Sequence, residues 1–164
     1  MLAFEKINQI REFTENDLLK NVLPYWIKYV PDAQYGGFYG RITNDQVIDQ
    51  EADKGAILNA RILYTFSAAY RIYGKKLYKA MADRAFDYII RHFIDPEYGG
   101  VYWSLDYKGK PSDTNKQFYA LAFVVYALAE YSRIKAEKSV MQAALDLYRV
   151  IEENAFDAEN NGYM

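Results

Sequence analysis

The sequence predicts an all-α protein that forms the N-terminal part of an (α/α)6 barrel, a toroid of helical hairpins with small β-hairpin loops at one rim. Three observations predict this fold. A loop motif recurs at a regular interval, two apolar helical segments overlay at nearly the same interval, and amphipathic segments alternate with them. In such repeats each unit buries its apolar face against the next.

The composition is that of a folded globular chain, and it excludes several classes of function. Of the 164 residues 51% are hydrophobic and 26% are charged, and the net charge is -2. Without a basic surplus to neutralise phosphates, we expect neither nucleic acid nor an anionic membrane as a partner. There are no cysteines and one histidine, His92, which excludes disulfides, thiol catalysis and a His-rich metal site within these residues.

The start of the chain carries charges every few residues, where a secretory signal needs an apolar run. No stretch reaches the roughly 18 apolar residues of a membrane span. We therefore expect a cytoplasmic protein without a membrane segment.

The loop motif is present in three copies, at residues 32–38, 95–101 and, in a weaker form, 157–163, which are 63 and 62 residues apart. Between these loops, residues 54–71 overlay residues 116–133 at a shift of 62. The overlay matches four pairs of identical residues: Lys54 with Lys116, Ala60 with Ala122, Tyr64 with Tyr126, and Arg71 with Arg133. One repeat therefore holds a helical pair and its loop.

The first expected element is an amphipathic helix from about residue 4 to Tyr29, which Pro24 should bend or break. Alternating residues from Phe38 to Ile48 around Asn44-Asp45 then predict a β-hairpin. The next helix should begin near Asp53 and is apolar almost all the way round, which is typical of a helix enclosed by protein. We call it an inner helix.

The second repeat has the same order. Residues 77–93 place apolar side chains at helical spacing with charges between them, which predicts an outer helix. Residues 101–107, before the turn at 108–111, predict a second hairpin. A second inner helix over 116–133 and a third outer helix over 141–151 complete the series.

We therefore interpret residues 1–164 as a single incomplete (α/α) barrel domain of about two and a half helical pairs. The sequence stops where a third inner helix is expected, which we interpret as truncation. A plain helical solenoid that binds another protein is the alternative. The long loops gather where the inner helices begin, and function tends to lie on such loops.

Arg61 and Tyr119 are the candidate site residues. Arg61 is a charged residue deep in an apolar run, and a buried guanidinium is costly unless it is paired or faces a polar cavity. In the overlay Arg61 matches Phe123, one turn after Tyr119, so both candidates share one helical register. The alternatives are that Arg61 pairs with Asp53 or Asp113, and that Tyr119 is a core aromatic.

Other chemistry has weaker support. His92, at the end of an outer helix, is expected to lie far from the loop-rich rim and is a poor catalytic candidate. Carboxylates are frequent near the rim, which keeps acid-base glycoside hydrolysis open as a rival: Asp45, Asp49, Asp53, Asp106 and Asp113.

Two runs of the sequence resemble those of a known protein family. KGAILNARILYTFSAAYR at 54–71 and DYKGKPSDTNKQFYALAFVVYALAEY at 106–131 resemble the cellobiose 2-epimerases, members of the N-acylglucosamine 2-epimerase superfamily. The resemblance implies an (α/α)6 barrel of which this chain is roughly the first two fifths. It also implies reversible epimerisation at C2 of the reducing-end glucose of β-1,4 disaccharides such as cellobiose, without a metal or nucleotide cofactor.

The resemblance assigns roles to both candidates. Arg61 matches an arginine of the first inner helix, which would stabilise an enediolate, and Tyr119 matches a tyrosine of the second, which would orient the sugar. The family's acid-base histidines lie on later inner helices, so we expect residues 1–164 alone to be inactive. We also expect self-association through the open barrel edge. A noncatalytic carbohydrate-binding or helical-repeat protein, an N-acylglucosamine 2-epimerase and a glycoside hydrolase remain alternatives.

Overall fold

The helices alternate as the sequence predicts, in a computed structural model that describes residues 2–163. The chain divides into two compact units, one ending at Pro31 and the other beginning at Asp32. The first unit is a helix in three parts: α1 (Leu2–Asp17), the π-helical turn η1 (Leu18–Val22) and α2 (Leu23–Tyr29).

Pro24 does not break this helix. A proline lacks an N–H, and its ring crowds the carbonyl four residues earlier, here that of Lys20. In the wider turn the N–H of Leu23 donates to the carbonyl of Leu18, five residues back, and α2 begins with the proline in its first turn. The π-helical turn therefore lets the helix continue past Pro24, where the sequence predicted a bend or a break.

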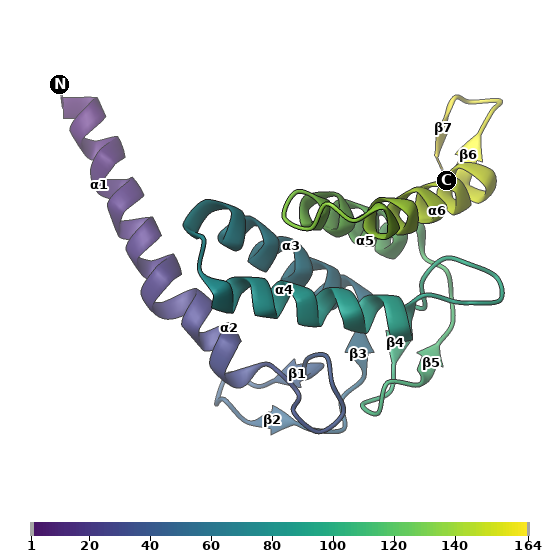
Figure 1. Cartoon of the computed structure of the whole chain (residues 1–164), viewed down its shortest axis with the longest axis horizontal. Helices are drawn as coiled ribbons and strands as arrows, with labels where there is room; N and C mark the ends of the chain where they lie inside the picture. The colour runs from purple at the N-terminus through teal and green to yellow at the C-terminus, as the bar shows by residue number, and fades with distance from the viewer. Residues whose placement is uncertain (1, 164) are drawn as a thin grey trace. The chain divides into compact units, whose positions relative to one another are not determined.

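The second unit contains two inner and two outer helices, labelled in Figure 1. The inner helices are α3 (Ala56–Tyr73) and α5 (Phe118–Ser132). The outer helices are α4 (Lys76–Tyr88), extended by the π-helical turn η2 (Ile89–Phe93), and α6 (Lys138–Ala155). The inner helices pack against each other, α4 packs on α3 and α6 packs on α5. This order confirms the predicted alternation.

Most of the strands lie in the loops that lead into α3 and α5, whereas the last two lie beyond the end of α6 (Figure 1). β1 (Arg41–Ile42) pairs antiparallel with β2 (Ile48–Asp49), and β4 (Ser104–Leu105) pairs with β5 (Pro111–Asp113), so both predicted hairpins are confirmed. Sequence reasoning missed β3 (Lys54–Gly55), which joins β4 in the sheet order β3-β4-β5. Because β3 occupies the residues after Asp53, α3 begins at Ala56 rather than near Asp53.

The three copies of the loop motif have one backbone design. In each copy the aspartate Oδ1 accepts backbone N–H groups two and three residues later: Asp32 from Gln34 and Tyr35, Asp95 from Glu97 and Tyr98, and Asp157 from Glu159 and Asn160. The first loop needs a glycine at position 37, where φ is +61° and a Cβ would lie 2.7 Å from the Tyr88 ring. The third loop lies within the hairpin formed by β6 (Phe156–Asp157) and β7 (Gly162–Tyr163).

A lysine closes each of the first two loops. The Nζ of Lys54 lies 2.7 Å from Asp32 Oδ2 and also donates to the carbonyl of Gly36, while the Nζ of Lys116 lies 2.7 Å from Asp95 Oδ2. Each lysine stands two residues before the first residue of an inner helix. We call these two ion pairs the Asp-Lys latches. They tie the start of each inner helix to the loop of its own repeat.

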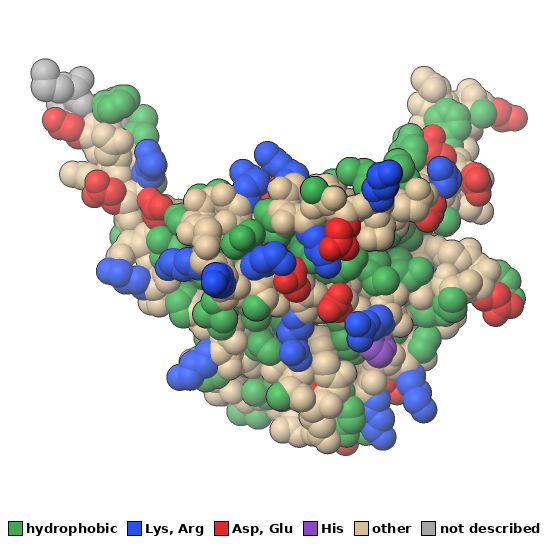
Figure 2. All heavy atoms as spheres, viewed as in Figure 1, with side chains coloured by type: hydrophobic (Ala, Val, Ile, Leu, Met, Phe, Trp, Pro, Cys, Tyr) green, Lys and Arg blue, Asp and Glu red, His purple; other side chains and the backbone are tan. Residues whose placement is uncertain are grey.

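The core of the second unit lies between its inner and outer helices. Its fully buried side chains include Leu63, Phe66, Ile89, Phe93, Leu121 and Leu128. Within residues 2–163 no helix is both long and apolar enough to cross a membrane. Figure 2 shows acidic and basic side chains interspersed on the face in view, as expected from the small net charge.

Candidate functional site

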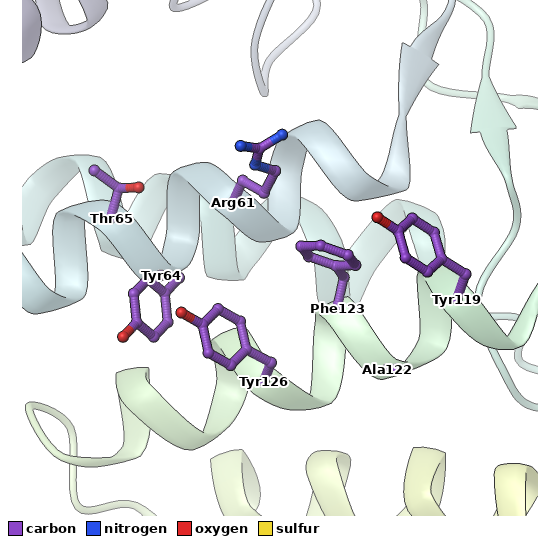
Figure 3. A pocket seen from close by; sticks show the side chains of 7 residues that line it. All are labelled: Arg61, Tyr64, Thr65, Tyr119, Ala122, Phe123 and Tyr126. Carbon is purple, nitrogen blue, oxygen red and sulfur yellow. The ribbon is translucent and has the colours of Figure 1, made fainter.

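An open cavity of about 660 Å³ lies along the exposed side of the two inner helices (Figure 3). Among residues 2–163 its lining comes from α3 and α5: Arg61, Tyr64, Thr65, Tyr119, Ala122, Phe123 and Tyr126. The structure therefore brings the two predicted site residues, Arg61 and Tyr119, into one cavity. Their shared register in the sequence repeat explains why, since α3 and α5 pack side by side.

Arg61 is exposed to solvent in this cavity rather than buried in the apolar run. Within residues 2–163 its guanidinium makes neither a hydrogen bond nor an ion pair. The suggested partners are engaged elsewhere: Asp53 accepts a hydrogen bond from Ser112, and Asp113 accepts hydrogen bonds from Asn115. The alternative of a structural ion pair is wrong, and Arg61 supplies a free positive charge to the cavity.

Tyr119 is not a core aromatic. Its side chain is 61% exposed, and its ring meets that of Phe123 edge to face, with the centroids 4.9 Å apart. The two rings form an aromatic wall on α5, and Figure 3 shows both among the side chains that line the cavity. An aromatic ring with a hydroxyl at its tip offers both an apolar face and a hydrogen-bonding group to a ligand.

The stacked tyrosines Tyr64 and Tyr126 were missed by sequence reasoning as site residues. Their rings stack with centroids 4.0 Å apart and planes 14° apart. A hydrogen bond with Tyr64, then burial, raises the pKa of Tyr126 to about 12, so its hydroxyl stays protonated at neutral pH. The sequence did contain a signal that could have identified them, because the two tyrosines occupy equivalent positions in the overlaid repeats.

None of the carboxylates proposed for hydrolysis lines this cavity within the described residues. Several of these carboxylates instead hold loops in their conformation. Asp49 accepts a hydrogen bond from the N–H of Glu51, and Asp106 accepts from the N–H groups of Lys108 and Lys110. The backbone hydrogen bond from Lys110, the largest of several, lowers the pKa of Asp106. The described part of the chain therefore gives no support to acid-base hydrolysis at this cavity.

His92 lies closer to the loops than the sequence suggested. Its ring stacks on Tyr88, and Nδ1 lies 3.2 Å from the carbonyl oxygen of Gly109, in the turn between β4 and β5. Outer helices end where inner helices begin, so the expectation that His92 is far from the loop-rich rim is wrong. It is still absent from the cavity lining. Among residues 2–163 no group of three or more His, Asp or Glu side chains could hold a metal ion.

In the described part of the chain, the cavity thus combines the unpaired guanidinium of Arg61 with aromatic faces and phenolic hydroxyls. A fixed guanidinium can stabilise negative charge that develops on a ligand's oxygens, and it can hold two oxygens at once. The aromatic faces suit the C–H faces of a carbohydrate. These groups can bind a ligand that presents oxygen atoms and an apolar ring face.

Comparison with known proteins agrees with the fold and the cavity described above. The family model described as N-acylglucosamine 2-epimerase matches residues 37–164. A cellobiose 2-epimerase from Bacteroides fragilis is 49% identical over 154 residues, which cover 94% of this chain and 39% of that protein. The chain spans about two fifths of the length of the curated relatives that it matches.

Solved structures support the fold. A cellobiose 2-epimerase from Bacillus thermoamylovorans superposes with a TM-score of 0.92 at 40% identity, covering 95% of this chain and 40% of that one. A GH76 α-mannanase from Bacteroides thetaiotaomicron superposes with a TM-score of 0.74 at 16% identity, covering 88% and 39%, which shows a shared fold alone. The cellobiose 2-epimerases are (α/α)6 barrels, so the predicted fold class is confirmed.

The repeated helical pairs, the cavity on the inner helices and the matched sequence point to one conclusion: this chain belongs to the N-acylglucosamine 2-epimerase family.

Proposed function

We propose that the protein to which this chain belongs is a sugar epimerase that reversibly inverts C2 of the reducing-end glucose of cellobiose-type β-1,4 disaccharides. The observation that carries the proposal is the unpaired guanidinium of Arg61 beside the exposed ring of Tyr119. The relatives named cellobiose 2-epimerase support the substrate class.

The chemistry explains why such a cavity would be useful. The C2 proton is acidic only beside a carbonyl, so the sugar ring opens before a base removes that proton. The product is a planar enediolate, which is reprotonated from the opposite face. In this proposal Arg61 stabilises the negative charge on the enediolate oxygens, and the hydroxyl of Tyr119 orients the sugar.

Two proton-transfer groups on opposite faces of the substrate are also needed. The described lining holds an arginine, tyrosines, a threonine and apolar residues, and neither a histidine nor a carboxylate is among them. We propose that histidines outside residues 1–164 supply this function. Residues 1–164 would then be the first two and a half helical pairs of a single barrel domain. The cytoplasmic location stays a prediction, which fractionation of the native host would test.

Incubation of the full-length polypeptide with cellobiose in deuterated water tests the proposal. Glucosyl-mannose that carries deuterium at C2 is the expected product, because the enediolate exchanges its proton with solvent. Free glucose would indicate hydrolysis instead, and recovery of unlabelled cellobiose alone would refute the epimerase proposal.

N-acylglucosamine is a second candidate substrate, because the family model that matches the chain carries that description. The same incubation with N-acetylglucosamine separates the two. Faster conversion of N-acetylglucosamine than of cellobiose, compared by kcat/KM, would favour the N-acylglucosamine 2-epimerase reading.

A further inference from the structure

The hydroxyl of Thr65 is available in the cavity, although the residue stands in the middle of α3. A serine or threonine within a helix can donate its hydroxyl to the carbonyl four residues earlier. Thr14 in α1 does so, with Oγ1 2.8 Å from the carbonyl oxygen of Ile10. Ser67 in α3 does so too, with Oγ 2.6 Å from the carbonyl oxygen of Leu63. Within residues 2–163 Thr65 makes neither this hydrogen bond nor another, and it is exposed in the cavity lining.

Thr65 lies next to Arg61 on the surface of α3. The two residues are four positions apart, which places them one above the other on one face of a helix. Side chains in a helix tilt towards its N-terminus, so the side chain of Thr65 covers the turn that carries Arg61. Figure 3 shows both on one side of α3, whereas Tyr64 lies on the side that faces Tyr126. The cavity therefore holds two adjacent hydrogen-bond donors, a guanidinium and a hydroxyl.

The repeated scaffold does not require these two donors. In the overlaid repeats the positions of Arg61 and Thr65 correspond to Phe123 and Ala127 on α5, whose side chains carry no donor. Ala127 is fully buried, whereas Thr65 is exposed. The first inner helix thus carries a pair of donors at positions where the second carries none, which points to a ligand rather than to packing.

The proposed epimerisation creates negative charge that such donors can stabilise. When a base removes the proton from C2 of the open-chain sugar, the electron pair of the C2–H bond forms the C1=C2 double bond. The π electron pair of the C1=O bond then moves to O1, which becomes anionic, while O2 keeps its proton. Reprotonation of C2 on the opposite face restores the carbonyl. An oxygen that gains charge in this way is stabilised by donors already in position.

We propose that the hydroxyl of Thr65 donates a hydrogen bond to O1 of the open-chain sugar and, together with the guanidinium of Arg61, stabilises the enediolate. This inference rests on the proposed epimerase function. The fork of Arg61 can hold O1 and O2 at once, and an anionic oxygen can accept a further hydrogen bond. Thr65 keeps its proton throughout, because an aliphatic alcohol is a weaker acid than an enediol. Thr65 is thus a catalytic residue that stabilises charge and transfers no proton.

A Thr65→Val variant of the full-length polypeptide tests this role, because valine has nearly the same shape and lacks the hydroxyl. We expect kcat on cellobiose to fall by about 10²-fold. KM should change by less than about threefold, because the charge on O1 develops only in the transition state. Thr65→Ser keeps a hydroxyl and should retain kcat to within about threefold of the wild type. Thr14→Val is the matched control, because the Thr14 hydroxyl is bound to its own helix, and should leave kcat unchanged.

Wild-type kcat in a folded Thr65→Val variant would overturn the inference, as would a higher KM with an unchanged kcat, which indicates a contact with the ground state only. Equal losses in Thr65→Val and Thr65→Ser, with lower melting temperatures, would assign Thr65 to packing and also overturn it. These results require an active wild type. A wild-type polypeptide that converts no cellobiose to glucosyl-mannose would instead overturn the proposed function, and this inference with it.

Discussion

Arg61 is exposed on a helix that is otherwise rich in buried apolar residues, and this placement is informative at the scale of one side chain. A guanidinium that served only stability would gain from a carboxylate partner, yet within residues 2–163 Arg61 has none. Its neighbours in the cavity are hydroxyls and aromatic rings. The side chain is therefore available to a ligand.

Replacing Arg61 with lysine in the full-length polypeptide should reduce kcat by about 10²- to 10³-fold, the usual loss when one stabilising donor is removed. Lysine keeps the charge but loses the planar fork that holds two oxygens. Steady-state rates on cellobiose measure the effect, with circular dichroism to confirm folding. A folded Arg61→Lys variant with wild-type activity would remove Arg61 from the site.

Tyr119→Phe should give a smaller defect, about tenfold in kcat/KM, because the ring against Phe123 remains and only the hydroxyl is lost. The melting temperature should be unchanged, since the ring is largely exposed. Kinetics and thermal denaturation of the same sample measure both. A variant that lost stability and kept full activity would return Tyr119 to a structural role.

The Asp-Lys latches operate at the scale of the element. Each one links a lysine that stands two residues before an inner helix to a loop about 20 residues earlier, and so fixes where that helix begins. The first latch is fully buried, with Lys54 and Asp32 each 1% exposed. Burial alone raises the pKa of Asp32, but hydrogen bonds from Lys54 and from two backbone amides outweigh it and lower the pKa.

Lys54→Met should lower the free energy of unfolding by about 3–5 kcal/mol, because it leaves the Asp32 carboxylate buried without its cation. Lys79→Met is the matched control, since Lys79 pairs with Asp83 on the half-exposed face of α4, and should cost at most about 1 kcal/mol. Urea denaturation of the full-length polypeptide measures both variants. Equal losses in the two would mean that burial does not strengthen the first latch.

The second latch should make the stability of the protein decrease at acidic pH. The hydrogen bond from Lys116, the largest effect, lowers the pKa of Asp95 to about 2, whereas an unfolded aspartate titrates near 3.9. The stability that Asp95 contributes is fully present above about pH 4 and is lost as the pH falls towards 2.

Melting temperatures between pH 5 and pH 2 should therefore fall less steeply in Asp95→Asn than in the wild type. Asp45→Asn is the control, because the Asp45 side chain makes no hydrogen bond or ion pair within residues 2–163. A wild-type slope in Asp95→Asn would mean that another carboxylate controls the acid response.

At the scale of the whole molecule, the described residues leave two apolar surfaces exposed. One is a groove of about 580 Å³ lined by α5, α6 and β7, and the other is a stripe on α1 at three-residue spacing, formed by Phe4, Ile7, Ile10 and Phe13. Apolar area left in water forfeits about 25 cal/mol per Å².

An isolated 1–164 polypeptide is therefore expected to epimerise nothing and either to self-associate or to be marginally folded. Size-exclusion chromatography with light scattering, followed by a cellobiose assay, measures these properties. A stable monomer would contradict the assignment of an open barrel edge, and a mannose-containing product would mean that histidines outside these residues are not essential.

Much of the fold could be predicted from the sequence, because the spacing of apolar residues along the chain determines where the helices form and which side of each is buried. The helical spacing of apolar residues predicted the inner and outer helices, and the repeat of 62 to 63 residues predicted three similar loops. The shared register of Arg61 and Tyr119 predicted their common cavity, since equivalent positions on packed repeats face the same way.

Contacts between distant side chains were decided by the tertiary structure alone. The latch lysines were visible as matched residues, but nothing local pairs Lys54 with Asp32, 22 positions earlier. The stacking of Tyr64 on Tyr126, the exposure of Arg61 and the approach of His92 to Gly109 depend in the same way on how helices and loops pack. Periodicity fixes which side of a helix a residue occupies, whereas its partner is set by the elements that fold against that side.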